Sequence, residues 1–515
     1  MKLTPTVRHN IIASFAGKTC RGIFNLAFIP IYIKLMGVEV YGLLGIFMSL
    51  SALFVLLDMG LSTTLNRELS RLSVIENSAQ ESRNLVRTFE VVYWAIGIVI
   101  GVFVIILAPL IAKYWINSTT VSNEIIEQAL LIMGMLLAFQ WPRAIYTGGL
   151  KGLQRQVLYN IIRTSSMLAR HVGAVLVLLF ISPSILSFFL WQSFVALLTT
   201  IVLAIWLWKS LPKSKNRSRF DKKLFVKNRK FVSGVLGISL ATTLLTQSDK
   251  IILSNMLTLE MFGYYMLAFT VANVLIRLVS PIHTALFPRL SQLVVRENQA
   301  DISDLYHKGC QLASITILPI AITLVCFSEE IISIWIEDPV VVNNTYMLLS
   351  LLTIGTTIKA FMTLPYTLQL AYGWTKLTFY KDIVALIFLI PLMLWMVPIY
   401  QGIGAAWVLI ALNLGLLIIE VLIMHQRLLK GEMNRWYSQD VFIPVLIVSS
   451  IGLIAREILP VDASKAILLL VVLSTVFFSF IASAWATGNL NIQSLQLLKT
   501  HSWRKLGRVD STLGH

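Results

Sequence analysis

Residues 91–110 read VVYWAIGIVIGVFVIILAPL, a run of twenty positions without one charged side chain. A helix of this length crosses a hydrocarbon core of about 30 Å. Inside lipid the backbone must pair its own polar groups, which a helix does within a single segment. A strand of a membrane barrel would instead place polar residues at every second position, and this run shows no such alternation. The run therefore predicts a membrane-spanning helix.

The rest of the chain repeats this pattern. It is 57% hydrophobic and 13% charged, whereas a soluble domain has about 25% charged residues. The fold class predicted is all-α, a polytopic membrane protein with about 14 transmembrane helices. The predicted spans lie near residues 10–33, 40–65, 88–112, 124–147, 159–181, 185–208, 231–256, 262–286, 310–327, 343–366, 380–398, 403–424, 441–458 and 466–487.

Lysine and arginine are distributed unequally between the two sides of the predicted membrane. If the N-terminus is cytoplasmic, the loops and tails on that side hold 29 of the 42, and the other side holds only Lys34, Lys113 and Lys465. The positive-inside rule therefore predicts that both termini are cytoplasmic. The net charge of +17 then needs no nucleic acid as partner. Its densest part, the loop 209–230, is expected to mark topology, with anionic membrane lipid as a candidate partner.

A short motif recurs at a fixed distance. GVEVYG at 37–42 resembles TLEMFG at 258–263, and GLQRQVLY at 152–159 resembles GWTKLTFY at 373–380, both at an offset of 221 residues. This shared register predicts two repeats of six spans in the same orientation, a plan found in secondary transporters. The predicted domains are a six-helix lobe at 1–208, a basic cytoplasmic connector at 209–230, a second six-helix lobe at 231–424, and two additional helices with a tail at 425–515.

Several basic residues lie inside predicted spans, where each costs roughly 2.5–3.5 kcal/mol on insertion scales. Arg163 and Arg170 are seven residues apart, so they share one face of a helix. Four polar residues of the first span share a face in the same way: Ser14, Lys18, Arg21 and Asn25. We expect these faces to line a water-filled cavity for an anion, because the fork of arginine matches phosphate oxygens. The predicted cavity residues are Lys18, Arg21, Asn25, Arg163, Arg170 and Lys359.

Other charges within spans have alternative interpretations. Asp249, Lys250 and Arg277 are candidates for ion coupling or for an ion pair between helices, and Arg143 is expected to reach an interface. The sequence contains no HExxH, CxxC or complete phosphate-loop motif, so we predict neither an enzyme nor a metal site nor a cofactor. A proton or a sodium ion remains a candidate coupling ion.

Four stretches of the sequence together resemble a known family. They are Asn10-Ile-Ile with Pro30-Ile-Tyr-Ile and GVEVYG, then QSDKIIL at 247–253 with FGYY at 262–265, then ALFPRLS at 285–291, and YTLQLAYG at 366–373. They resemble the bacterial polysaccharide exporters of the O-antigen flippase (Wzx-like) type, in the multidrug/oligosaccharidyl-lipid/polysaccharide exporter superfamily. The resemblance covers most of residues 10–425.

This resemblance implies a flippase of the bacterial cytoplasmic (inner) membrane. It would move an undecaprenyl-diphosphate-linked oligosaccharide to the outer leaflet by alternating access, with a polysaccharide polymerase and glycosyltransferases as candidate partners. Fourteen spans are also typical of the lipid II flippase branch, which stays open as an alternative. Two further alternatives stay open. One is a cation-coupled multidrug exporter, which would need buried carboxylates. The other is a membrane scaffold that recruits partners through the loop 209–230.

Overall fold

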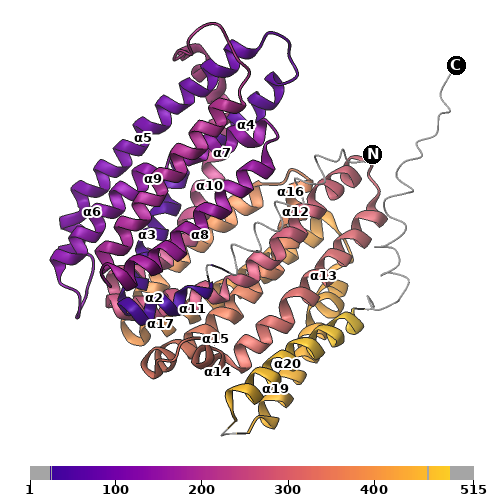
Figure 1. Ribbon diagram of the computed structural model, residues 1–515. Coiled ribbons are helices and arrows are strands. Elements are labelled where there is room, and N and C mark those ends of the chain that lie inside the picture. The colour runs from indigo at the N-terminus through magenta and orange to yellow at the C-terminus, as the bar shows by residue number, and fades with distance from the viewer. Residues whose placement is uncertain (1–23, 25, 59, 461–462, 488–515) are drawn as a thin grey trace, which may run out of the picture. The chain divides into compact units, whose positions relative to one another are not determined.

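The described chain is helical throughout, as its apolar blocks predict (Figure 1). This computed structural model describes residue 24 and residues 26–58, 60–460 and 463–487, and for residues 223–239 it describes the backbone alone. Contacts divide the described chain into a first unit, which ends at Met266, and a second unit, which begins at Leu267. Each unit is described below by itself.

The first unit contains ten helical segments and the beginning of an eleventh within its described residues. They are α2 (Ile29–Met36), α3 (Glu39–Val55), the 3-10 turn η1 (Leu56–Asp58), α4 (Leu61–Leu72), α5 (Ala79–Tyr114), α6 (Asn123–Gln140), α7 (Arg143–Gly152), α8 (Gln156–Phe180), α9 (Ile185–Ser210), α10 (Lys222–Met256) and the first part of α11 (Leu259–Ala272). Helix α9 packs against α6, α7 and α8, and α5 packs against α6. Leu65, Phe89, Tyr146 and Leu207 fill the core between α4, α5, α7 and α9.

Helices α4 and α7 approach each other at two glycines of α7. A Cβ atom on Gly148 would lie 2.5 Å from the backbone oxygen of Ser62, and one on Gly152 would lie 2.6 Å from that of Asn66. The hydroxyl of Ser70 donates to the Gly152 carbonyl oxygen at 3.0 Å. Any larger residue at these two positions would push the helices apart, so the glycines set the distance between α4 and α7.

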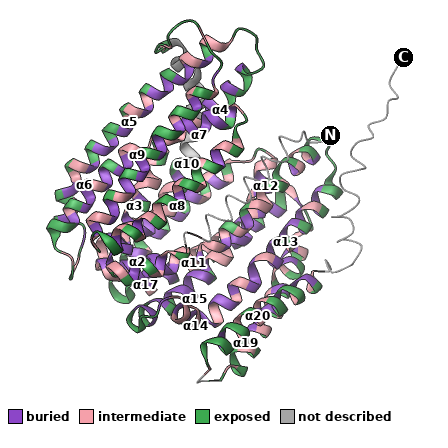
Figure 2. Cartoon of the chain, viewed as in Figure 1, coloured by how far each residue is buried: buried purple, intermediate pink, exposed green. Residues whose placement is uncertain are grey.

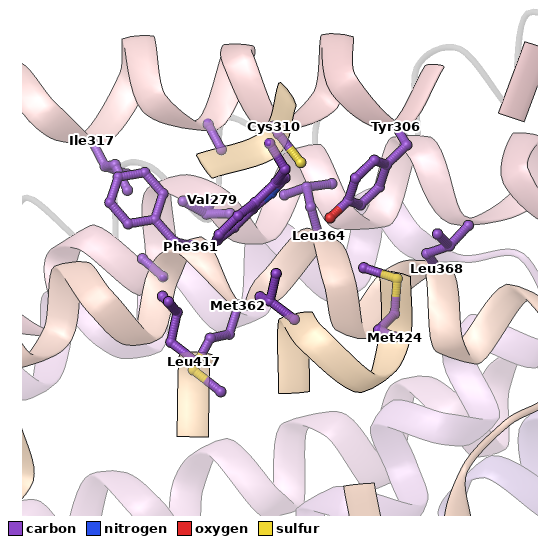
Figure 3. Packing of buried hydrophobic residues seen from close by; sticks show 14 of the residues in the cluster. Val279, Tyr306, Cys310, Ile317, Phe361, Met362, Leu364, Leu368, Leu417 and Met424 are labelled. Carbon is purple, nitrogen blue, oxygen red and sulfur yellow. The ribbon is translucent and has the colours of Figure 1, made fainter. Parts of the chain in front are cut away.

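The second unit continues from α11 through the rest of the chain. Its elements are α12 (Val274–Val295), α13 (Gln299–Cys326), α14 (Ser328–Trp335), α15 (Pro339–Phe361), α16 (Thr363–Ala371), α17 (Lys376–Leu428), α18 (Met433–Arg435), the π-helical segment η2 (Trp436–Phe442), α19 (Ile443–Ile458) and α20 (Lys465–Ala486). Figure 3 shows its core, in which Tyr306 and Cys310 of α13 lie near Leu364 of α16 and Met424 of α17. Helices α19 and α20 pack against α13.

Eleven helices of the described residues are long and apolar enough to span a membrane. One of them, α17, has 53 residues and a break at Gln401, where φ is 52°. It therefore covers two predicted spans, 380–398 and 403–424. The predicted first span, 10–33, lies mostly outside the described residues. The all-α membrane fold is confirmed, whereas the number fourteen stays a prediction.

Exposed residues recur along the spanning helices (Figure 2), and many of them are large and apolar. On α20, for example, Leu470 is 67% exposed, Phe477 61% and Trp485 72%. Soluble proteins rarely expose continuous apolar patches of this size, whereas lipid-facing helices present them as their ordinary surface. The chain is therefore a multi-pass membrane protein.

The contact division does not follow the boundaries of the sequence repeat. Helix α10, which belongs to the second repeat by offset, packs against α3 and α5 and lies in the first unit. Contacts record which helices touch, whereas the repeat records which segments are similar in sequence. The lobes 1–208 and 231–424, the connector 209–230 and the appendage 425–515 stay a prediction.

Candidate anion-binding pocket

The first unit contains a pocket of about 660 Å³, a volume within the usual range for small-molecule sites. It is lined by residues of α3, η1, α4 and α5 and of the four helices α6 to α9. Four lysine or arginine side chains and one carboxylate side chain line it. They are Arg143, Lys151, Arg163, Arg170 and Asp58.

Helix α8 supplies one wall of this pocket. Arg163, Ser166 and Arg170 all line it, and their spacing of three and four residues puts them on one face of the helix. Helix α8 runs without interruption from Gln156 to Phe180. The shared face predicted from the sequence is therefore present, and it is turned toward the pocket.

Helix α7 supplies a second wall. Arg143, Thr147 and Lys151 line the pocket at successive intervals of four residues. The two glycines of the same helix, Gly148 and Gly152, pack against α4. The close crossing of α4 and α7 thus fixes the face of α7 that carries the two cations.

The arginines of the pocket lack acidic partners in the part of the chain that the structure describes. Nη2 of Arg170 donates to Oε1 of Gln140 at 3.2 Å, and its buried Nε has no hydrogen-bond partner among these residues. No described carboxylate lies within salt-bridge distance of Arg143, Arg163 or Arg170. Residues 1–25 contain no aspartate or glutamate, so that segment supplies none either. The pocket holds positive charge that the described protein does not neutralise.

The one acidic residue of the pocket is already hydrogen-bonded. Asp58 accepts from the Ser62 hydroxyl at 2.8 Å and from the hydroxyl of Tyr93. Tyr159 lies between two of the cations, because Nζ of Lys151 is 5.1 Å from its ring centre and the Arg163 guanidinium carbon is 5.8 Å from it. These contacts hold the cations at the wall of the pocket without cancelling their charge.

The remaining predicted cavity residues do not line this pocket within the described chain. Lys18, Arg21 and Asn25 lie outside the described residues. Lys359 is exposed near the end of α15, in the second unit. The substrate-binding role of all six predicted residues stays a prediction.

Two of the three predicted coupling residues, Asp249 and Lys250, contact each other. Lys250 Nζ lies 2.9 Å from an Asp249 oxygen, and both residues are buried on α10. This ion pair is formed within one helix, and the hydroxyl of Tyr265 on α11 donates to Asp249 at 2.8 Å. Arg277 is exposed on α12, in the second unit.

Sequence reasoning missed two of the pocket cations. Arg143 was expected at an interface and Lys151 in a loop, but both lie on α7 and line the pocket. Their spacing of eight residues, with Thr147 between them, is a signal of a shared helical face. The predicted span 124–147 is interrupted at Trp141 and Pro142, where α6 ends and α7 begins. The shared face of Arg143 and Lys151 belongs to α7 alone and is therefore difficult to recognise from the sequence.

Two buried carboxylates of the second unit have basic partners instead. Glu420 is fully buried and accepts from Lys381 Nζ at 2.8 Å and from the Gln369 amide at 2.7 Å. His307 of α13 contacts Asp440 of η2, which also accepts from Gln311 at 3.1 Å. Within the described residues, no cluster of three or more histidine, cysteine, aspartate or glutamate side chains could hold a metal ion.

Two family matches identify the chain as a helical membrane transporter of the multidrug/oligosaccharidyl-lipid/polysaccharide exporter superfamily. Residues 7–294 match the family described as "Polysaccharide biosynthesis protein", and residues 236–395 match the family MatE. The first match covers more than half of the chain, which therefore belongs to the polysaccharide biosynthesis protein family. No curated protein matches the sequence.

Solved structures share the fold at low sequence identity. "Lipid II flippase MurJ, inward closed conformation" has a TM-score of 0.70 at 16% identity, over 93% of this chain and 99% of that one. An inward-facing multidrug resistance MATE family transporter has a TM-score of 0.60 at 12% identity, over 81% of this chain and 96% of its own. The MATE multidrug transporter DinF-BH has a TM-score of 0.58 at 16% identity, over 83% of this chain and 96% of its own. These structures are of a flippase and of transporters.

Proposed function

We propose that the protein is a secondary transporter that flips an undecaprenyl-diphosphate-linked oligosaccharide from the inner to the outer leaflet of the cytoplasmic membrane. The observation that carries the proposal is the pocket with four cations and one carboxylate. A cation exporter would need the opposite balance. Arginine and diphosphate pair through several charge-assisted hydrogen bonds, and this pairing replaces the water that the head group loses on entering the membrane.

Arg170 and Arg163 are assigned to the phosphate oxygens, with Arg143 and Lys151 on the facing helix. The buried Nε of Arg170 without a partner is the donor that a phosphate oxygen would satisfy. With a cytoplasm that is electrically negative, outward movement of one negative charge is favourable by about 2.3 kcal/mol per 100 mV, if the charges of the protein stay fixed. A proton or sodium ion remains the candidate for additional coupling.

A lipid II flippase is the second candidate. The observation that favours it is the fold shared with MurJ over 93% of this chain. Both candidates move a diphosphate on an isoprenoid chain, so the same pocket serves either one. They differ in the sugar that follows the diphosphate.

The test is a flipping assay in proteoliposomes. The probe is a fluorescent isoprenyl-diphosphate-linked disaccharide, and its exposure in the outer leaflet is followed by a quencher that cannot cross the membrane. We expect Arg163→Gln and Arg170→Gln to abolish protein-dependent flipping. Arg296→Gln, an exposed cation outside the pocket, is the matched control and should leave flipping unchanged. Flipping at the unaltered rate in both pocket variants would overturn the proposal.

A further inference from the structure

A second cavity of the first unit is a groove of about 460 Å³ on its surface. Trp94 of α5 forms one side of it, and residues between Thr200 and Lys209 of α9 form the other. On α9 the lining residues come in neighbouring pairs four positions apart, so they make one continuous face of the helix. Ile201 and Ile205 in this face are 42% and 47% exposed. The groove is therefore open to the bilayer, and it shares no described lining residue with the anion-binding pocket.

The polar atoms along the walls of this groove are bonded inside the protein. The indole N–H of Trp94 donates to the hydroxyl of Tyr146 at 3.0 Å, and that of Trp208 donates to a carboxylate oxygen of Glu90 at 3.2 Å. The hydroxyl of Thr200 donates to a carbonyl oxygen of α6 at 2.7 Å. A polar group without such a partner would be costly to cover with hydrocarbon. Because these groups have partners, the walls are suited to an alkyl chain.

The length of the groove matches one leaflet of a bilayer. Thr200 and Lys209 are nine residues apart, which corresponds to about 14 Å along a helix that rises about 1.5 Å per residue. Half of a hydrocarbon core of about 30 Å is about 15 Å. Lys209 lies in the last turn of α9, at the end that the positive-inside rule assigns to the cytoplasm. One acyl chain of the cytoplasmic leaflet would thus fill the groove from end to end.

Two cations lie at the cytoplasmic end of the groove. Lys209 is exposed and lines the groove, and the guanidinium carbon of Arg83 lies 5.3 Å from the ring centre of Trp208. Neither cation has a carboxylate within salt-bridge distance in the part of the chain that the structure describes. The carboxylate of Glu90 is already paired with Arg87 at 2.8 Å. This end of the groove therefore carries positive charge that a phosphate can neutralise.

The basic loop that follows α9 is fixed beside the same end. The backbone N–H of Arg219 donates to the Asn84 side chain at 3.0 Å, and that of Asp221 donates to the Thr88 hydroxyl at 2.8 Å. Both acceptors lie on α5, in the turns next to Arg83. Hydrogen bonds thus hold the loop against α5. Its exposed cations add to the positive potential that attracts anionic lipid to this surface.

We propose that the groove between α5 and α9 binds an anionic glycerophospholipid of the cytoplasmic leaflet. One acyl chain lies along α9 between Trp94 and Trp208, and the phosphate of the head group is bound by Lys209 and Arg83. The walls select a hydrocarbon chain, and the two cations select a net negative head group over a zwitterionic one. This site is independent of the cargo in the anion-binding pocket.

The experiment measures the quenching of tryptophan fluorescence by phospholipids with brominated acyl chains in mixed micelles. Trp94 and Trp208 line the groove, so a bound chain brings bromine to their rings. Trp94→Phe/Trp208→Phe supplies the background from the other tryptophans. We expect half-quenching of the groove signal at a roughly tenfold lower concentration of brominated phosphatidylglycerol than of brominated phosphatidylcholine. Equal quenching by the two lipids would overturn the proposal.

Two double variants test the cations. Lys209→Gln/Arg83→Gln should abolish the preference for phosphatidylglycerol, because it removes both charges at the end of the groove. Lys213→Gln/Lys215→Gln is the matched control, since it removes two exposed charges from the loop without touching the groove, and it should keep the preference. A preference that persists in the first variant, or that is lost equally in the control, would contradict the proposal.

Two further measurements separate this site from the transport of cargo. Arg163→Gln/Arg170→Gln should keep the preference for phosphatidylglycerol, whether or not it flips a lipid-linked glycan. Flipping and lipid binding can therefore fail independently. An isoprenyl diphosphate in excess should leave the quenching by brominated phosphatidylglycerol unchanged. Its displacement of the brominated lipid would assign the groove to the tail of the cargo and overturn the proposal.

Discussion

Neutralising a cation should have different consequences at a buried ion pair of the second unit and in the pocket of the first unit, where the arginines have no acidic partner among the described residues. Lys381 contacts a fully buried Glu420. Lys381→Gln would remove this cation and leave the carboxylate with the hydrogen bond from the Gln369 amide. Breaking a buried pair in this way costs about 3–5 kcal/mol. Since the Lys381 side chain is 13% exposed, the lower end, about 3 kcal/mol, is expected.

Arg170→Gln should behave differently. It removes one hydrogen bond, the 3.2 Å contact to Gln140, worth about 1 kcal/mol. It also relieves the repulsion between Arg170 and the other cations of the pocket. The lost hydrogen bond destabilises the protein and the relieved repulsion stabilises it. The free energy of unfolding should therefore change by less than about 1 kcal/mol. Binding sites commonly hold unpaired charge at some expense of stability.

Two assays on the same preparations separate these outcomes. Thermal unfolding in detergent should show a clear loss for Lys381→Gln and little change for Arg170→Gln. Flipping in proteoliposomes should be abolished by Arg170→Gln. Partial recovery of stability in Lys381→Gln/Glu420→Gln would show that the loss came from the unpaired carboxylate. A strongly destabilised Arg170→Gln protein would refute the reasoning, because Arg170 would then be a structural residue.

Two further predictions concern α4. Gly148→Leu should separate α4 from α7, because its Cβ would lie 2.5 Å from the Ser62 oxygen, and we expect it to reduce flipping at least about tenfold while membrane insertion, measured by fractionation, is kept. Partial burial alone would raise the pKa of Glu68, but hydrogen bonds from Arg71 and Arg67 outweigh it and hold this pKa below its usual value. Because the folded pKa is the lower one, the ion pair stabilises the protein above about pH 4.3 and the contribution is lost as pH falls through the folded pKa. Thermal unfolding at several acidic pH values should show a weaker loss of stability in Glu68→Gln than in the parent.

The fold could be predicted largely from hydropathy, because lipid imposes helices on any long apolar segment. The shared face of Arg163 and Arg170 could also be predicted, since helical geometry alone determines it. Arg143 and Lys151 could not be placed in the same way. Their position depends on where α7 packs, and two glycines that contact α4 decide this. Sequence spacing shows which residues share a helix face, but not which way that face is turned.

The repeat offers a second lesson about what sequence can supply. Its offset of 221 residues could be found from two short matches, and it predicted two similar halves. It could not show that α10, which belongs to the second repeat by offset, packs against α3 and α5, because contacts between helices depend on packing. The paired Lys381 and the open Arg163 show likewise that the similar halves differ in how they treat charge.

The central claim is that the pocket binds an anionic head group through its arginines, and direct binding tests it best. A short-chain isoprenyl diphosphate, which carries no sugar, is titrated calorimetrically into the detergent-solubilised protein, into Arg163→Gln/Arg170→Gln, and into the Arg296→Gln control. The claim predicts that affinity falls at least about a hundredfold in the double variant, since two charge-assisted contacts are lost. The control should bind as the parent does, and the uncharged isoprenol should bind weakly to all three proteins. Equal affinity of the parent and the double variant for the diphosphate would contradict the claim.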